Sequence, residues 1–321
     1  MIANPAARGA LAPHALEAAA EAMRARGWHV AIEVATSALD ARERAERHAR
    51  AGVDALVACG GDGTLLAVVN GIRTADDATG EPSRTAVGII PAGTANVWAA
   101  EAGLPRDPIR ALALLEDGER RRIDLGSARI GEGARVRFLL VCGVGLDAAV
   151  VEAVEARPAW KRRLGRFAFG APALAALAGW PSIDTRITID GDEVHAPRLL
   201  LALAANSSRY GGVASLTHSS DLDDGLLEVT IFEGDRSPSS RLALALQALR
   251  GHLDERVVRG VTHRRASTLT ITPTRPLPVE VDGDGDAIGR CGPDAPLHID
   301  VEPRAVTMIF AAPAIGRRGR A

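Results

Sequence analysis

Short apolar runs alternate with amphipathic segments over the first 120 residues of the chain. The runs at residues 1–3, 30–35, 56–58 and 86–90 are too short for helices and predict buried strands. The segments at residues 14–26, 38–50 and 107–116 space their apolar residues three or four positions apart and predict helices, and Gly27 and Gly52 follow the first two as helix ends. Strands that alternate with helices predict a parallel α/β sheet.

The pattern changes after Arg120. Strand-like runs follow with few helical segments between them, at residues 121–129, 135–141, 184–189, 199–205, 226–232, 257–261, 268–272, 278–281 and 297–301. We therefore predict an α/β domain at residues 1–122 and a β-rich domain at residues 123–304. Residues 305–321 can return to either domain and end in a basic tail.

Composition narrows the class of protein. A chain of 321 residues suits two domains, and its net charge of −2 gives no general attraction to nucleic acid. The three cysteines lie far apart without a CxxC pair, which favours reduced thiols in a cytoplasmic protein. We expect no export signal and no membrane-spanning helix, because no apolar run reaches about 18 residues. Any membrane contact is then peripheral.

The most informative motif is Gly60-Gly61-Asp62-Gly63-Thr64, which follows a buried apolar run and precedes a helical segment. A glycine turn between a strand and a helix points backbone N–H groups at a phosphate, and glycine lets the backbone approach it closely. The aspartate can bind Mg²⁺, and the threonine can donate a hydrogen bond to a phosphate oxygen. A tight turn without a ligand is the alternative, but the added aspartate and threonine favour phosphate binding.

Other polar loops follow neighbouring strands of the first domain, at residues 4–8 and 93–96, and Thr36 also follows a strand. Loops at the carboxyl ends of parallel strands gather at one edge of the sheet. Asparagine, glycine, threonine and aspartate together at that edge suit a nucleotide.

These motifs resemble the catalytic domain of diacylglycerol and sphingosine kinases, and the chain is most similar to bacterial soluble lipid kinases. The resemblance rests on NPxxxG near the start, GGDGT with a following VVNG, and PxGTAN at residues 91–96. It continues through IDLG at 123–126, GVGLDA at 143–148, DGLL at 224–227 and VDGD at 281–284. GGDGT alone also occurs in NAD kinases, so the ordered set is what makes the resemblance specific.

The resemblance implies a first domain of the NAD kinase and diacylglycerol kinase type, which binds ATP at its junction with a β-sandwich domain for the lipid. Asp62 is then expected near the phosphates and their Mg²⁺, and Asp124 is expected to support the metal through water. The residues expected to line the nucleotide are Asn4, Pro5, Ala6, Ala7, Arg8, Thr36, Gly60, Gly61, Asp62, Gly63, Thr64, Leu65, Leu66, Gly93, Thr94 and Asn96.

An acidic turn at residues 221–225 precedes a strand-like run. The resemblance implies a structural Mg²⁺ here, bound by the Asp224 carboxylate and by backbone carbonyls at Asp221 and Leu226; oxygen ligands suit this hard cation. An acidic hairpin turn without metal is the alternative.

The segment Asp282-Gly283-Asp284 is similar to the DGE motif of the family. A hydroxyl group that attacks a γ-phosphate needs a carboxylate to take its proton, and two carboxylates close together raise one pKa. Which of the two aspartates is the base stays open. A surface turn is one alternative; a calcium loop is another, but Ala287 and Pro293 stand where such a loop needs glycine and glutamate.

Two further regions are expected near the lipid acceptor. Asp147 is predicted to lie in a glycine-rich turn, in a region that approaches the lipid head group in the family, although a helix N-cap is an equal alternative. Tyr210, Gly211 and Gly212 belong to a turn near the acceptor pocket by the same resemblance, or to a plain loop. Residues 159–180 begin with a basic cluster and continue as an apolar stretch, which favours contact with an anionic membrane surface over a core helix.

We therefore predict an ATP- and Mg²⁺-dependent lipid kinase that is cytoplasmic, peripherally membrane-associated and a candidate homodimer. The family often has Asn-Glu where this chain has Leu66 and Ala67, and many members have aspartate where it has Val97. These departures put the identity of the phosphate acceptor in doubt more than the binding of ATP. A NAD kinase-like phosphotransferase and a catalytically inactive nucleotide or lipid sensor are the alternatives.

Overall fold

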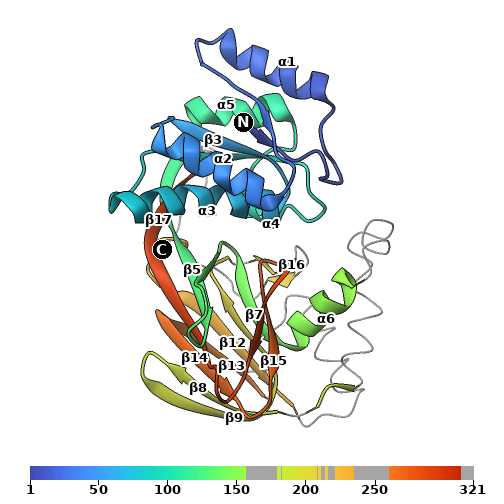
Figure 1. Cartoon of the computed structure of the whole chain (residues 1–321), viewed down its shortest axis with the longest axis vertical. Helices are drawn as coiled ribbons and strands as arrows, with labels where there is room; N and C mark the ends of the chain where they lie inside the picture. Colours follow the sequence, from blue (N-terminus) through green and yellow to red (C-terminus); the bar gives the residue numbers. More distant parts are fainter. Residues whose placement is uncertain are drawn as a thin grey trace, which may run out of the picture. The chain divides into compact units, whose positions relative to one another are not determined.

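The computed structural model describes residues 1–156, 179–181, 183–207, 209–210, 214–215, 221–234 and 260–311. The chain forms two compact units, one of Met1–Ile123 with Arg304–Ala321 and one of Asp124–Pro303 (Figure 1). The basic segment at 159–178 and most of the strand expected at 257–261 lie outside the described residues.

The first unit contains a parallel sheet, as its alternating pattern predicts. Its strands run in the order β17-β4-β3-β1-β2. They are β1 (Ile2–Ala3), β2 (Glu33–Val34), β3 (Ala55–Gly60), β4 (Ala86–Pro91) and the last part of β17 (Leu297–Phe310). The segment from 305 onward, which the sequence left open, therefore pairs with β4 through Thr307 and Met308.

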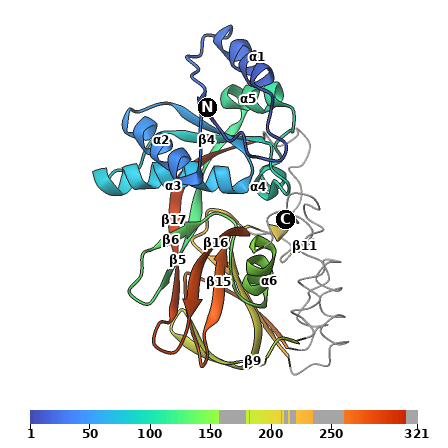
Figure 2. The same ribbon diagram turned by 45° about the vertical axis from the view of Figure 1, so that its right-hand side comes forward.

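Helices cover both faces of this sheet (Figures 1 and 2). They are α1 (Pro13–Arg24), α2 (Ala38–Arg50), α3 (Asp62–Thr79), α4 (Val97–Glu101) and α5 (Pro108–Asp117). Helices α1 and α5 bury Leu16, Met23 and Leu112 against sheet residues such as Val57. Helices α2 and α3 cross closely at Gly71. A Cβ at this position would lie 2.3 Å from the carbonyl oxygen of Arg42, so the crossing requires glycine.

The second unit contains an antiparallel sheet in the order β16-β15-β7-β9-β8-β14-β17. Strand β12 pairs with β9 and β13, and β5 pairs with β17 and β6. A buried apolar core that includes Phe138, Ile187 and Ile271 lies within this unit. The bounds of the other elements are β5 (Glu119–Ile130), β6 (Val136–Phe138), β7 (Val141–Gly145), α6 (Leu146–Glu155), β8 (Ile183–Ile189), β9 (Asp192–Ala205), β10 (Arg209–Tyr210), β11 (Ala214–Ser215), β12 (Leu227–Glu233), β13 (Val261–Ala266), β14 (Thr268–Pro273), β15 (Leu277–Val281) and β16 (Asp284–Cys291).

The expectation of a single strand at residues 135–141 is wrong. Strand β6 ends at Phe138 and β7 begins at Val141, because the carboxylate of Asp282 binds the intervening backbone N–H groups. The glycine-rich stretch that follows is therefore strand β7 rather than a turn. Within the described residues, none of the helices combines the length and the apolar character needed to cross a membrane.

Candidate functional site

The GGDGT motif lies where strand β3 passes into helix α3. Strand β3 ends at Gly60, Gly61 is the N-cap, and helix α3 begins at Asp62. Gly63 and Thr64 therefore belong to the first turn of α3, whose backbone N–H groups carry the positive end of the helix dipole. The motif thus has the geometry of an anion-binding helix start.

The loop after β1 is joined to this helix start. The side-chain amide of Asn4 donates to Thr64 Oγ1 at 3.1 Å, and its Oδ1 accepts the Ala6 N–H at 2.9 Å. A Cβ on Gly60 would lie 2.4 Å from Thr64 Oγ1, so only glycine leaves room for this contact. The structure therefore brings the first two expected nucleotide loops together.

Asp62 connects α3 to α4. Its Oδ2 accepts the Val97 N–H and its Oδ1 accepts the Trp98 N–H, both at 3.0 Å. These amides open helix α4, so the carboxylate caps a helix that starts 35 residues further along the chain. Burial raises the pKa of Asp62, and the backbone hydrogen bonds act in the opposite direction. The side chain is thus committed to holding two loops in register.

The loop at residues 93–96 is the third loop expected at the nucleotide, and its backbone packs against the backbone of the GGDGT turn. A Cβ on Gly93 would lie 2.5 Å from the Cα of Gly61. Asn96 closes this loop with two hydrogen bonds to the backbone of Gly93, at 2.8 and 2.9 Å, and has a left-handed φ of 50°. Thr94 is exposed at the tip of the loop.

Thr36 follows β2 as expected, but its side chain has a structural partner. Its N–H and Oγ1 both donate to Asp40 Oδ2, at 2.8 and 3.0 Å. Ser37 Oγ accepts the N–H of Asp40, which completes the cap of α2. The structure therefore places Thr36 in a helix cap, with its side chain still exposed.

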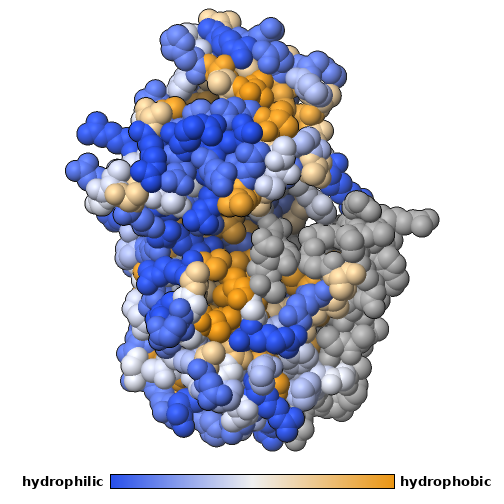
Figure 3. Space-filling model, viewed as in Figure 1, coloured by the Kyte–Doolittle hydropathy of each residue, from blue (hydrophilic) through white to orange (hydrophobic). Residues whose placement is uncertain are grey.

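A pocket in the first unit begins at Asn4 and Pro5 and continues over apolar side chains. The space-filling view shows apolar surface beside α1 in this unit (Figure 3). The apolar lining includes Leu11, Ile32 and Val34. Sequence reasoning missed Ile32 and Val34, although their spacing of two residues already places both on one face of an extended segment.

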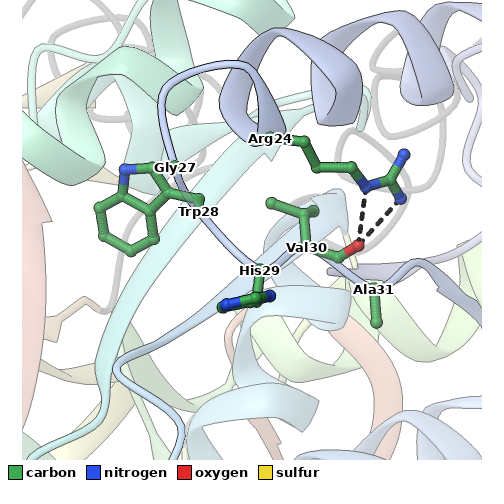
Figure 4. Close-up of a pocket in the computed structure, with 6 residues that line it drawn as sticks. All are labelled: Arg24, Gly27, Trp28, His29, Val30 and Ala31. Atoms are coloured by element: carbon green, nitrogen blue, oxygen red, sulfur yellow. Dashed lines mark hydrogen bonds between the residues drawn. The ribbon is translucent and has the colours of Figure 1, made fainter.

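A second pocket has no connection with the expected site. It is lined by Arg24 and by the segment from Gly27 to Ala31 (Figure 4). The guanidinium of Arg24 donates to the carbonyl oxygen of Val30 from Nε at 3.1 Å and from Nη2 at 2.8 Å. Arg24 is therefore engaged with the pocket's own wall.

In the second unit, Asp124 is joined to the acidic turn at 221–226. Its side chain is fully buried, and its Oδ2 accepts the Gly225 N–H at 2.7 Å. Its backbone N–H donates to the Leu222 carbonyl oxygen, also at 2.7 Å. The structure thus joins Asp124, which is expected to support the metal at the phosphates, to the turn that is expected to bind a second, structural Mg²⁺.

The donor set of this turn fits a hard cation only in part. Asp224 Oδ1 accepts the Leu226 N–H at 3.0 Å, and Oδ2 pairs with Arg265. Among the described residues, no three histidine, cysteine, aspartate or glutamate side chains gather as a metal cluster. A cation here would take Asp224, backbone carbonyls at Asp221 and Leu226, and water, which is a set that Mg²⁺ accepts.

The carboxylate of Asp282 is bound by backbone amides. Its Oδ2 accepts the Leu139 N–H at 2.8 Å, and its Oδ1 accepts the Leu140 and Val141 N–H groups at 2.7 and 2.9 Å. Asp282 has a left-handed φ of 56° and opens the turn between β15 and β16. Asp284 begins β16 on the other side of this turn. These three hydrogen bonds occupy acceptor sites on the carboxylate that a calcium ion in a calcium loop would need.

Glu280 is a residue that sequence reasoning missed. It is 1% exposed in strand β15, and its Oε2 accepts the Gly283 N–H at 2.7 Å. Its carboxyl group also hydrogen-bonds Asp147, which lies in the first turn of α6 rather than at its N-cap. Burial, followed by the nearby Asp147, raises the pKa of Glu280 well above its usual range. A glutamate within an otherwise apolar strand was the available signal.

The other residues expected near the acceptor are Tyr210, Gly211 and Gly212. Tyr210 lies in β10, which pairs with β11. Gly211 and Gly212 lie outside the described residues.

Comparison with known proteins identifies both halves of the chain. Residues 1–128 match the model of the diacylglycerol kinase catalytic domain, and residues 141–310 match that of the YegS C-terminal NAD kinase beta sandwich-like domain. A diacylglycerol kinase from Mycobacterium tuberculosis is 31% identical over 233 residues, which cover 72% of each chain. A protein named "Probable lipid kinase YegS-like" from Chromohalobacter salexigens is 31% identical over 209 residues, or 65% of this chain and 63% of that one.

Solved structures show the same fold. The crystal structure of a diacylglycerol kinase from Bacillus anthracis has a TM-score of 0.68 and 20% identity, covering 96% of this chain and 95% of that one. An NAD kinase from Archaeoglobus fulgidus in complex with ATP has a TM-score of 0.52 and 14% identity, over 97% and 92% of the two chains. The predicted α/β domain followed by a β-sandwich domain is therefore confirmed, as is the family resemblance.

Proposed function

Since the chain belongs to the family of bacterial diacylglycerol kinases and YegS-like lipid kinases, which are phosphotransferases with an alcohol as acceptor, we propose that it transfers the γ-phosphate of ATP to a lipid hydroxyl group. The observation that carries the nucleotide half of this proposal is the junction of three loops at the start of α3. Asn4 bonds Thr64, Asp62 caps α4, and Gly93 packs on Gly61.

The role we propose for these loops is to present backbone N–H groups to the phosphates. The glycines at the turn allow phosphate oxygens to approach the main chain closely, and the start of an 18-residue helix favours negative charge. Asp62 then acts chiefly by holding the loops in register. The apolar pocket beside Asn4 and Pro5 is the proposed place of the nucleotide base.

Mg²⁺ would neutralise phosphate charge in this reaction. In the second unit, the residues proposed to hold a structural Mg²⁺ are Asp224 with the carbonyls of Asp221 and Leu226, and Asp124 fixes the turn through Gly225. Oδ2 of Asp224 also pairs with Arg265 beside this turn.

We assign the general base to Asp284. The three backbone N–H groups that bind Asp282 stabilise its ionised form and lower its ability to accept a proton. Asp284 stands two residues further along the same turn, at the first position of β16. In the proposed step the lipid oxygen bonds to the γ-phosphorus, its proton passes to the Asp284 carboxylate, and the bond from phosphorus to the ADP oxygen breaks.

The experiment is an acceptor screen with ATP labelled on its γ-phosphate. Dioleoylglycerol, sphingosine and ceramide are offered in mixed micelles with Mg²⁺, and NAD is offered in solution. We expect transfer to a lipid and a kcat about 10²- to 10⁴-fold lower in Asp284→Asn. Asp282→Asn places an amide NH₂ against backbone donors, so we expect it to lower the thermal stability of the protein as well.

The other hypotheses predict different results. Transfer to NAD but to none of the lipids would identify a NAD kinase-like enzyme and refute the lipid proposal. ATP binding without transfer to any acceptor, with no effect of Asp284→Asn, would identify a sensor. We also propose peripheral membrane contact at the basic and apolar segment 159–180, which vesicle sedimentation tests, and a homodimer, which light scattering tests.

A further inference from the structure

Glu280 joins two parts of the acceptor-side unit that the sequence treats separately. One carboxyl oxygen accepts the Gly283 N–H at 2.7 Å and so holds the turn that carries Asp284. The same carboxyl group also forms a hydrogen bond with the side chain of Asp147 in the first turn of α6. One buried side chain therefore contacts both the turn with the proposed base and the residue expected near the lipid head group.

Gly143 creates the space in which these two carboxyl groups meet. It lies opposite Glu280 in the pairing of β7 with β15. A Cβ at this position would lie 2.5 Å from Asp147 Oδ2 and 2.6 Å from Glu280 Oε1. Both oxygens thus face the same small volume above a glycine, and any larger residue at position 143 would separate them.

A hydrogen bond between two carboxyl groups requires one proton, because an ionised carboxylate can only accept. Glu280 is almost fully buried, whereas Asp147 is partly exposed. The neutral form therefore falls to Glu280, whose proton points at Asp147, while its second oxygen accepts from Gly283. In this state one protonated carboxyl group fixes the turn and Asp147 together.

We propose that Glu280 is a positioning residue of the phosphotransfer reaction, which holds Asp147 and the Asp284 turn in one arrangement through a shared proton. This inference rests on the proposed function. Loss of the proton places two negative charges above Gly143, and their repulsion moves α6 away from the turn. The arrangement is then competent only while the pair keeps its proton.

The groups that act electrostatically on Glu280 include the carboxyl groups of Asp147 and Asp282. Asp282 lies in the same turn, where its carboxyl group accepts hydrogen bonds from backbone N–H groups. Cys142 on β7 and Cys291 on β16 are buried thiols, and burial raises the pKa of both. Deprotonation of Glu280 therefore adds a negative charge beside the carboxyl groups of Asp147 and Asp282.

Two substitutions separate positioning from simple packing. Glu280→Gln keeps both contacts, because its amide oxygen accepts from Gly283 and its NH₂ donates to Asp147, but it cannot lose a proton. Glu280→Ala removes both contacts. Asp76→Asn is the matched control, since Asp76 is also a buried carboxyl group, bound to Arg73 and the Ser83 N–H in the first unit.

The assay measures kcat and the KM for ATP with dioleoylglycerol in mixed micelles from pH 5.5 to 9.5. We expect wild-type kcat to fall at the alkaline end and this fall to shift upward by at least about one pH unit in Glu280→Gln. Glu280→Ala lowers kcat about 100-fold with the KM for ATP unchanged. Asp76→Asn keeps the wild-type pH profile. Identical profiles for wild type and Glu280→Gln would overturn the proposal.

Infrared spectroscopy gives a readout that does not depend on activity. The wild type should show the C=O stretching band of a protonated carboxyl group at pH 7.5, absent in Glu280→Gln and present in Asp76→Asn. If the band is present but no lipid is phosphorylated, the proposed function fails and the shared proton stands. If a lipid is phosphorylated and the band is missing from the wild type, the inference about Glu280 fails alone.

Discussion

The strongest test of the nucleotide loops is the substitution Asp62→Ala. It removes the acceptor of two backbone N–H groups, those of Val97 and Trp98, at the start of α4. These N–H groups have no hydrogen-bond acceptor within their own helix, because the first four N–H groups of a helix have no intrahelical partner. The methyl group of alanine would therefore leave both donors unsatisfied in a largely buried position.

The magnitude follows from the two hydrogen bonds. A bond between a backbone N–H and an ionised carboxylate contributes about 1.5–3 kcal/mol. Burial of the Asp62 carboxylate offsets part of this gain. We expect a net loss of about 3 kcal/mol for the local free energy of opening of α4, which corresponds to roughly 100-fold faster amide exchange.

Hydrogen exchange measured by mass spectrometry resolves this effect in the peptide that covers residues 93–102. The control is Asp107→Ala, because Asp107 is an exposed N-cap whose Oδ1 accepts the Arg110 N–H at 2.8 Å. Its loss should cost about 1 kcal/mol, confined to α5. Asp62→Ala should also weaken ATP binding in calorimetry, whereas Asp107→Ala should not. Wild-type exchange at 93–102 in Asp62→Ala would refute the link between the two loops.

Three further substitutions test the scaffold. The hydrogen bond from Arg44 lowers the pKa of Glu33 to about 2, so this carboxylate stabilises the fold above its unfolded pKa near 4.5 and the gain is lost as pH falls toward 2. Glu33→Gln should therefore lower the free energy of unfolding by about 2 kcal/mol at pH 7 and by much less at pH 2.5; equal urea midpoint shifts at both pH values would contradict this. Gly143→Ala should lower kcat at least about 10-fold without changing the KM for ATP, and an unchanged kcat would mean that the carboxyl groups do not meet there. Ser37→Ala should lower the urea midpoint by the equivalent of about 1 kcal/mol through loss of the α2 cap, and an unchanged midpoint would show that Ser37 Oγ contributes nothing to the cap.

Local signals predicted most of the first unit, except for the pairing of the last part of β17 with β4. The apolar run before Gly60 and the helical pattern after it predict β3 and α3, and Ser37 predicts the start of α2. Strand and helix patterns depend on residues close together in the sequence, so they also predicted a β-rich second unit. The resemblance added its β-sandwich fold, which comparison confirms.

Distant contacts set the features that the sequence did not predict. The break between β6 and β7 comes from Asp282, 142 residues away from Leu140. Strand β16 was not predicted because it begins with aspartate and glycine, which favour turns in isolation. The role of Glu280 was also hidden, because one acidic residue in an apolar strand has no meaning until its partner is placed.

Three acidic residues of the motifs share a structural role, because their oxygens bind backbone N–H groups of distant segments. Asp62, Asp124 and Asp282 each accept backbone N–H groups from segments 35, 101 and about 142 residues away, so each fixes one loop against another. An ionised carboxylate offers about four acceptor sites, and Asp282 uses three of them on the main chain. Such a group is a poor proton acceptor, however suggestive its motif. The proton of the acceptor hydroxyl is therefore assigned to Asp284, and the pH dependence of its placement to the carboxyl pair of Glu280 and Asp147.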